Sequence, residues 1–128
     1  MEKLESAKNA LARLEAILSD PDSDEKTRDA SIQRFEFTSE ICWKALQEVL
    51  KQVYDVEVRY PKGCYQAAFQ VSLIDEDLCL ALTRSIKDRN LTSHTYNQEL
   101  SEMIYRHIPI HAKAFALLLN RLQTVIDP

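Results

Sequence analysis

Hydrophobic positions near the start of the chain predict an amphipathic helix. They alternate at steps of three and four residues, at Leu4, Ala7, Leu11, Leu14 and Leu18. This spacing places the apolar side chains on one stripe of a helix, close to the seam of a coiled coil. Residues 20–24 then interrupt the pattern with turn residues and a proline. Either Ser23 or Asp24 is suited to cap the helix that follows.

A longer stripe predicts a second helix from about Lys26 to Tyr54. Its members recur with the period of a helix and are Ile32, Phe35, Ser39, Cys42, Trp43, Leu46, Val49, Leu50 and Val53. We interpret Trp43 as an anchor in the core or in a dimer interface. Pro61 and Gly63 mark the next connection. A short helix is then expected through Tyr65, Ala68, Phe69 and Val71.

Two further helices are expected in the second half of the chain. Asp75 is suited to cap a helix that carries Leu78, Leu80, Ala81, Leu82 and Ile86. The last helix is expected to run from about Thr95 to Ile126. Its seam consists of Ile104, Ile108, His111, Phe115, Leu118, Leu122 and Val125. Because Pro109 lies inside this stretch, a kink or a break is expected near residues 106–108.

Long helices joined by short connections predict an all-α fold, an up-and-down bundle of four to five helices. We assign residues 1–128 to a single domain, which is near the common size for one hydrophobic core. The single glycine of the chain agrees with this class, because sheets with tight turns usually need several glycines. Apolar stripes on several helices also suit a homodimer formed through helices.

Composition and charge narrow the class of protein further. The formal net charge of −4 argues against a protein that coats nucleic acid by bulk electrostatics. Three cysteines without a C-x-x-C pair indicate reduced thiols. The first residues lack an apolar signal core, and no run approaches the length of a membrane span. We therefore expect a soluble, cytoplasmic protein with no membrane partner.

Candidate chemistry is concentrated between Arg89 and Tyr96, which read R-x4-H-x-Y. Arginine grips phosphate, histidine moves protons near neutral pH, and tyrosine adds a hydroxyl. Cleavage of RNA by its own 2′-hydroxyl needs a base, an acid and a cation, which His94 and Arg89 can supply without metal. Spacing alone favours a simpler interpretation, in which Arg89 stabilises a helix C-terminus and His94 is a loop residue.

Neighbouring polar residues admit two interpretations each. Tyr96 is either a functional hydroxyl or an amphipathic side chain half-buried at the edge of the bundle. Asn90 either orients the histidine or a phosphate, or simply favours a turn. Glu36 and Glu40 lie one turn apart beside the apolar stripe of the long helix. They are able to orient the histidine or pair with the arginine, or they belong to a solvated flank.

The last helix carries a second pair of histidines, His107 and His111, spaced i, i+4. This spacing occurs in metal sites, but here no Glu motif or cysteine pair accompanies it. We expect no metal and no other cofactor. The alternative is a mild basic patch for RNA or an acidic partner, formed by Arg106, His107, His111 and Lys113.

Two stretches together resemble the signatures of a known family. Residues 32–46 read IQRFEFTSEICWKAL and residues 89–97 read RNLTSHTYN. They resemble the HEPN-domain proteins described as nucleotidyltransferase substrate-binding proteins, which are related to HepT toxins. Intervening positions also fit, namely Pro61, Ala67, Ala68, Leu73 and Ile74. Ser72 and Leu82 depart from the family, which often has glycine and tryptophan there, and both are interpreted as packing positions.

The resemblance implies a homodimeric helical bundle whose R-x4-H motifs face a cleft near the dimer interface. It also implies a partner, a minimal nucleotidyltransferase (MNT). In HepT-like members the motif is tied to metal-independent ribonuclease activity that is toxic, and the MNT antitoxin attaches AMP to the tyrosine. By position, Arg89 and His94 become the catalytic pair and Tyr96 the modified residue. Two alternatives remain: a non-catalytic subunit that binds a nucleotide or another substrate, and a scaffold whose motif only stabilises the bundle.

Overall fold

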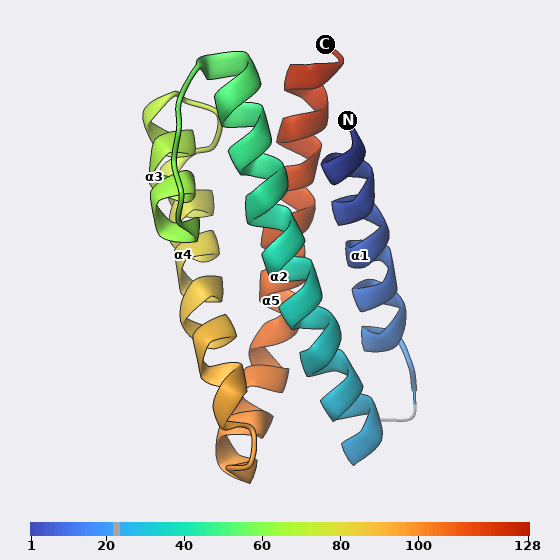
Figure 1. Ribbon diagram of the computed structural model, residues 1–128. Coiled ribbons are helices and arrows are strands. Elements are labelled where there is room, and N and C mark those ends of the chain that lie inside the picture. The colour runs from blue at the N-terminus through green and yellow to red at the C-terminus, as the bar shows by residue number, and fades with distance from the viewer. Residues whose placement is uncertain (22–23) are drawn as a thin grey trace.

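The computed structural model describes residues 1–21 and 24–128, and this part of the chain is entirely helical (Figure 1). It contains five α-helices and one short 3-10 helix, in the order α1 (Glu2–Leu18), α2 (Glu25–Tyr54), α3 (Pro61–Gln70), α4 (Glu76–Leu91), η1 (Thr92–His94) and α5 (Gln98–Ile126). The predicted all-α class is confirmed. None of the described helices is long and apolar enough to cross a membrane.

The four longer helices lie side by side along one axis, and the short α3 lies against α2 and α4 (Figure 1). Both ends of the chain lie at the same end of the bundle, and the turn between α4 and α5 lies at the opposite end. Helix α5 packs against α1, α2 and α4, and α2 packs against α1, α3, α4 and α5, so these two longest helices form the centre of the bundle. The turn with the R-x4-H-x-Y residues is thereby placed at one end of the bundle.

The predicted stripes form most of the core. In α1 the buried residues are Leu4, Ala7, Leu11 and Leu14, and in α5 every predicted seam residue except the half-buried Val125 is buried. Three apolar residues of the predicted helices are exposed instead, Val53, Phe69 and Leu80. Leu80 is exposed because a helix period of 3.6 residues carries it away from the buried side chains of Leu78 and Leu82.

Aspartate and asparagine side chains set three of the helix starts. Asp24 accepts a hydrogen bond from the Thr27 backbone N–H and Asp75 from that of Leu78, both at 2.8 Å. Asn97 accepts one from Leu100 at 3.1 Å, so α5 begins at Gln98 rather than near Thr95. Each such cap contributes about 1 kcal/mol to helix stability. Ser23, the other candidate cap for α2, lies outside the described residues.

The residues expected to mark a connection, Pro61 and Gly63, lie inside α3 instead. Pro61 occupies the first turn of the helix, where its missing N–H costs nothing. A Cβ atom on Gly63 would come within 2.7 Å of Cγ1 of Val58. Glycine is therefore required there for close packing against the segment before α3, and not for a turn.

Pro109 does not break the last helix, so of the kink or break expected near residues 106–108, the break is excluded. Helix α5 continues from Gln98 to Ile126 with Pro109 inside it. Proline in a helix interior costs about 3 kcal/mol. Burial of Ile108 on one side of the proline and Phe115 on the other offsets this cost, because both side chains lie fully in the core.

The cysteines are free thiols, as expected from their spacing. Cys42 and Cys64 are buried, and Cys79 is half-buried. Burial raises the pKa of the Cys64 thiol to about 11 and that of Cys42 further still. Because the thiolate is the reactive form, both thiols are inert at neutral pH and act as small apolar side chains.

Candidate functional site

The end of α4 and the turn after it place the R-x4-H-x-Y residues on the surface. Arg89 lies in the last turn of α4, and His94 is the last residue of η1. Tyr96 follows in the turn before α5. His94 and Tyr96 are both exposed, and 86% of the Tyr96 surface is accessible. The interpretation of Tyr96 as a half-buried edge residue is therefore wrong.

Arg89 is held by its own turn and by α2. Its Nη1 donates to Oγ1 of Thr92 at 3.1 Å, and the Thr92 hydroxyl donates to the Arg89 carbonyl at 2.6 Å. Nη1 also lies 3.7 Å from Oε2 of Glu36, and the two side chains are about one third exposed. An ion pair of this kind contributes only about 0–1 kcal/mol. Among the described residues, Nε of Arg89 is buried without a hydrogen-bond partner, and Nη2 has no partner but is not buried, so Nη2 is the donor left for an anion.

His94 and Tyr96 lie on the same side of the turn. The Tyr96 hydroxyl is 3.4 Å from Nδ1 of His94, and the two rings meet edge to face with centroids 5.9 Å apart. Among the described residues, the His94 side chain makes no hydrogen bond other than this long one. Nε2 of His94 thus remains available to exchange a proton with a bound molecule.

The structure does not join Arg89 directly to His94. Among the described residues, no hydrogen bond or ion pair connects these two side chains. The connection between them is the short η1 turn, in which Thr92 is buried. A bound phosphate group would therefore have to bridge the arginine and the histidine.

Three other residues were proposed for the site, and only the Glu36 side chain contacts that of Arg89 among these three. Glu40 accepts a hydrogen bond from Nε1 of Trp43 at 3.2 Å and pairs with Lys44 at 3.3 Å, so it belongs to a separate cluster on α2. Asn90 is exposed, and its backbone carbonyl accepts a hydrogen bond from the Ser93 hydroxyl at 3.3 Å.

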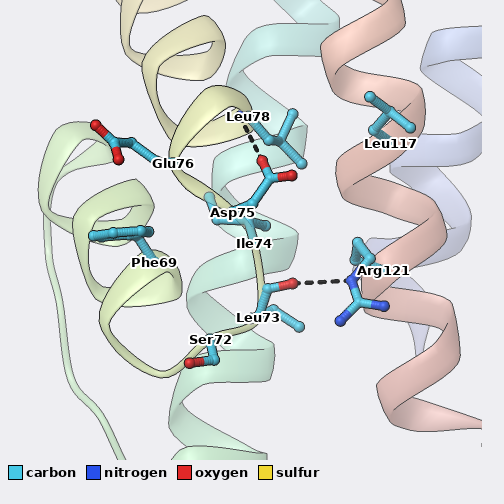
Figure 2. A pocket seen from close by; sticks show the side chains of 9 residues that line it. All are labelled: Phe69, Ser72, Leu73, Ile74, Asp75, Glu76, Leu78, Leu117 and Arg121. Atoms are coloured by element: carbon cyan, nitrogen blue, oxygen red, sulfur yellow. Dashed lines mark hydrogen bonds between the residues drawn. The ribbon is translucent and has the colours of Figure 1, made fainter.

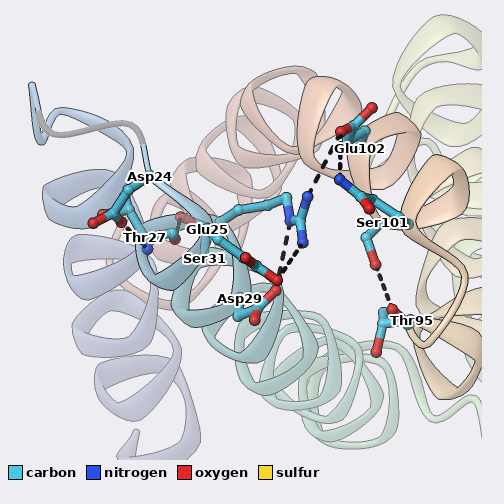
Figure 3. Close-up of polar contacts among 10 residues, drawn as sticks. Asp24, Glu25, Thr27, Asp29, Ser31, Thr95, Ser101 and Glu102 are labelled. Carbon is cyan, nitrogen blue, oxygen red and sulfur yellow. Dashed lines mark hydrogen bonds and ion pairs between the residues drawn. The ribbon is translucent and has the colours of Figure 1, made fainter.

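A hydrogen bond from α5 fixes the turn that carries His94 and Tyr96, and an ion pair joins α5 to α2 (Figure 3). The buried Ser101 hydroxyl donates to the carbonyl of Thr95 at 2.8 Å. Glu102, the next residue of α5, lies 3.8 Å from Nη1 of Arg28 in α2. The Arg28 side chain is largely buried and also lies near Asp29. These contacts tie the starts of α2 and α5 together and hold the turn between α4 and α5 against them.

A second cluster includes Asp88, the residue before Arg89 in α4, and was not expected from the sequence. Asp88 is buried in α4, and its Oδ2 lies 2.9 Å from Nδ1 of His107 and 2.6 Å from Nε2 of His111. Burial lowers the pKa of His111, although the hydrogen bond to Asp88 acts in the opposite direction. The His111 ring also stacks on Phe35 with centroids 5.3 Å apart. Since His111 is buried, it cannot contribute to a basic surface patch with Arg106 and Lys113.

A cavity of about 600 Å³ lies elsewhere, where the α3–α4 connection faces α5 (Figure 2). Its lining includes Asp75, Glu76 and Arg121, together with apolar side chains such as Leu117. Arg121 donates through Nε to the Leu73 carbonyl at 3.0 Å, so one of its guanidinium donors already has a partner. Two carboxylates beside one arginine do not favour an anionic nucleotide, and the R-x4-H-x-Y residues do not line this cavity.

Comparison with known proteins gave one family match and several related structures. The family described as nucleotidyltransferase substrate binding protein like matches residues 2–124. A crystal structure of a protein from Thermus thermophilus is 38% identical in sequence, with a TM-score of 0.87. The alignment covers 91% of this chain and 98% of that one. No match was found among curated proteins.

More distant structures share the fold. A Haemophilus influenzae protein, said to reveal the fold of a substrate binding domain of a nucleotidyltransferase, is 21% identical with a TM-score of 0.78, covering 94% of this chain and 98% of that one. The tri-AMPylated Shewanella oneidensis HEPN toxin, in complex with MNT antitoxin, is 18% identical with a TM-score of 0.74, covering 96% and 95%. At such identities the likeness establishes the helical arrangement alone.

Proposed function

The chain belongs to the family of nucleotidyltransferase substrate-binding-like proteins, and from this premise we propose that it is a HepT-like ribonuclease controlled by a minimal nucleotidyltransferase partner. Arg89 and His94 would cleave RNA without a metal, and the partner would silence them by attaching AMP to Tyr96. The observation that carries the proposal is the exposed R-x4-H-x-Y turn, in which the arginine and the histidine each keep unused hydrogen-bonding atoms.

The proposed reaction transfers a phosphoryl group within the RNA. His94 takes the proton of a 2′-hydroxyl through Nε2, and the 2′-oxygen attacks the adjacent phosphorus. The bond from phosphorus to the 5′-oxygen of the next nucleotide breaks, leaving a 2′,3′-cyclic phosphate and a 5′-hydroxyl. In the proposed homodimer the equivalent histidine of the second copy, in its protonated form, supplies the proton to the leaving oxygen.

Arg89 has the electrostatic role in this reaction. Negative charge builds on the phosphorane oxygens, and a positioned guanidinium offsets it. The weak ion pair with Glu36 holds Arg89 in place before substrate binds. An RNA phosphodiester carries one negative charge, as the carboxylate does, but the phosphorane gains a second and so competes with Glu36 for Arg89. Loss of one such donor typically costs a factor of about 10²–10³ in rate.

Tyr96 is well placed to act as a switch. Its hydroxyl is accessible to the active site of a partner without any unfolding of the bundle, and it lies 3.4 Å from Nδ1 of His94. An AMP group on this hydroxyl would bring a charged phosphate and a large base next to the histidine. The added phosphate competes for Arg89, and the base blocks access of RNA to His94.

Incubation with the MNT partner and ATP is expected to add the mass of AMP to the wild-type protein and to remove its activity on RNA. The Tyr96→Phe variant should remain unmodified, because the accepting hydroxyl is gone. Tyr60→Phe is the matched control, since Tyr60 is also widely exposed, at 73%, but precedes α3. Intact-mass spectrometry measures the modification. Equal labelling of the Tyr96→Phe variant and the wild type would exclude Tyr96 as the acceptor.

A second candidate function is a non-catalytic subunit that binds a nucleotide or another substrate for the nucleotidyltransferase. The absence of a direct contact between Arg89 and His94 among the described residues favours this alternative, as does the description of the family. In this function the same two side chains bind a phosphate without cleaving it.

Expression in bacterial cells distinguishes the two functions. We expect the chain alone to arrest growth and coexpression of the MNT partner to relieve the arrest. Harmless expression of a folded protein would contradict the ribonuclease proposal. If that protein also bound ATP or AMP in calorimetry, and lost the binding in the Arg89→Ala variant, the substrate-binding function would be supported.

A further inference from the structure

The Asp88, His107 and His111 side chains form a compact cluster between α4 and α5. One carboxylate oxygen and two ring nitrogens, one from each residue, all lie within 4.8 Å of one another. Asp88 and His111 are buried, whereas 44% of the His107 side chain is exposed. The cluster thus has a closed inner side and an open outer side, through which a small ion has a path from solvent.

One buried carboxylate oxygen serves both histidines of the cluster. Oδ2 of Asp88 contacts Nδ1 of His107 and Nε2 of His111, so the carboxylate depends on these two rings in the protein interior. The stack on Phe35 keeps the His111 ring in this position. Arg89, the next residue along the chain, directs its guanidinium to Thr92 and Glu36. A cation between the three side chains would satisfy the carboxylate and both nitrogens together.

We propose that Asp88, His107 and His111 form a binding site for a divalent transition metal, best matched by Zn²⁺. Zinc accepts imidazole nitrogen and carboxylate oxygen at about 2.0–2.2 Å, and three protein ligands with one open position are typical of its non-structural sites. The two histidines are spaced i, i+4 on α5, so their side chains leave the same face of the helix. The fourth position lies on the open side of the cluster and takes water.

Small movements are enough to admit the ion. Two ligand atoms around a tetrahedral zinc are about 3.3 Å apart for bonds of about 2.0–2.1 Å. The present contacts of 2.9 and 2.6 Å therefore need to widen by about 0.4 and 0.7 Å. The half-exposed His107 ring has room for this adjustment, while Phe35 holds the His111 ring in place.

The surroundings also predict how tightly the ion is held. Zinc-binding histidines usually donate their second N–H to an acceptor, and loss of that support costs about 10–100-fold in affinity. Nδ1 of His111 is buried without a hydrogen-bond partner among the described residues. The site is therefore expected to exchange its metal instead of holding it permanently. Bound metal would fasten α4 to α5 one residue before Arg89, independently of whether the protein cleaves RNA.

Titration of the purified full chain with ZnCl₂ in a calorimeter tests this site. The wild type is expected to bind one Zn²⁺ per chain, and its melting temperature should rise with zinc. The His107→Ala variant should bind at least tenfold more weakly and melt at a temperature that zinc does not change. His107 is the ligand to replace, because it is half-exposed and its loss leaves the core intact.

Two variants control for other zinc ligands on the chain. His94→Ala removes the exposed histidine of the turn, and Cys79→Ser removes the half-buried thiol. Both should bind zinc as the wild type does. The proposal is overturned if the wild type shows no saturable binding, or if His107→Ala binds zinc with unchanged affinity. Loss of RNA cleavage would not bear on this result, since zinc binding is measured without RNA.

Discussion

Replacing His94 by alanine is expected to slow RNA cleavage by about 10²–10⁴-fold without lowering the melting temperature. A loss of this size is typical when a general acid–base catalyst is removed. It should appear as a lower kcat, because the histidine ring acts on the proton that moves in the transition state. Stability should change by less than about 0.5 kcal/mol. The side chain is exposed, and its hydrogen-bonding contact in the described part of the chain is the long one to Tyr96.

Ser93→Ala is the matched control for this experiment. Ser93 precedes His94 in the same 3-10 turn, is also exposed, and makes a weak hydrogen bond to the Asn90 carbonyl. Its loss disturbs the turn about as much as the His94 substitution but removes no acid–base group, so cleavage should stay near the wild-type rate. Single-turnover kinetics on a short RNA measure both. Equal rates for His94→Ala and the wild type would remove the histidine from the mechanism.

Replacing Phe35 by alanine is expected to reduce the free energy of unfolding by about 3–5 kcal/mol, the usual cost of emptying a buried aromatic site. Phe35 is fully buried in α2, and its ring stacks on His111 and on Phe115, with centroids 5.3 and 6.2 Å away. The substitution therefore opens a cavity where α2 meets α5, the contact on which the bundle depends. Urea denaturation measures the loss.

Phe37 provides the comparison for Phe35 within the same helix. It has the same side chain two residues farther along α2, but 71% of its surface is exposed. Phe37→Ala should change the free energy of unfolding by no more than about 0.5 kcal/mol, as is usual for exposed positions. A loss for Phe37→Ala as large as that for Phe35→Ala would show that the wrong face of α2 had been assigned to the core.

The helices can be predicted from the sequence because burial of one helix face makes apolar residues recur with the helical period. The stripes of α1 and α5 follow from side chains that must all reach the same core, and Asp75 follows from the chemistry of a helix start. Proline and glycine were the sources of error. Pro109 lies in a continuous α5 beside the buried Ile108, and Gly63 is required by a close approach of Val58. Both effects depend on packing, which a one-dimensional pattern does not contain.

The site was predictable to a smaller extent. The motif itself is contiguous, so the sequence located Arg89, His94 and Tyr96. It also offered Glu36 and Glu40 as partners of the arginine, and the structure places only Glu36 in contact with it among these two. The choice between them depends on how α2 crosses α4, which cannot be derived from residues one helical turn apart.

Asp88 was missed altogether, for a related reason. In the sequence it stands among charged residues, and such residues usually face solvent. The i, i+4 spacing of His107 and His111 predicts no site by itself, because no Glu motif or cysteine pair accompanies it. The contact between α4 and α5 brings Asp88 to both histidines, so the cluster exists only in the folded chain.

Arg89 and His94 also have to be distinguished from a merely structural pair. Their contacts in the described residues are an ion pair of about 0–1 kcal/mol, one hydrogen bond from Arg89 to Thr92 and one long contact to Tyr96. Such contacts contribute little to the stability of a bundle with a core of this size. A purely stabilising role would require a large drop in melting temperature on substitution of Arg89.

Cleavage of two short RNAs that differ by one oxygen atom tests most directly whether Arg89 and His94 act on the 2′-hydroxyl. Both carry a single susceptible position, and one has a 2′-deoxy sugar there. With purified wild-type protein in EDTA, the all-ribose RNA should be cut to a 2′,3′-cyclic phosphate, and the deoxy-substituted RNA should remain intact. Failure to cut either RNA, or cleavage of both at equal rates, would contradict the proposed mechanism.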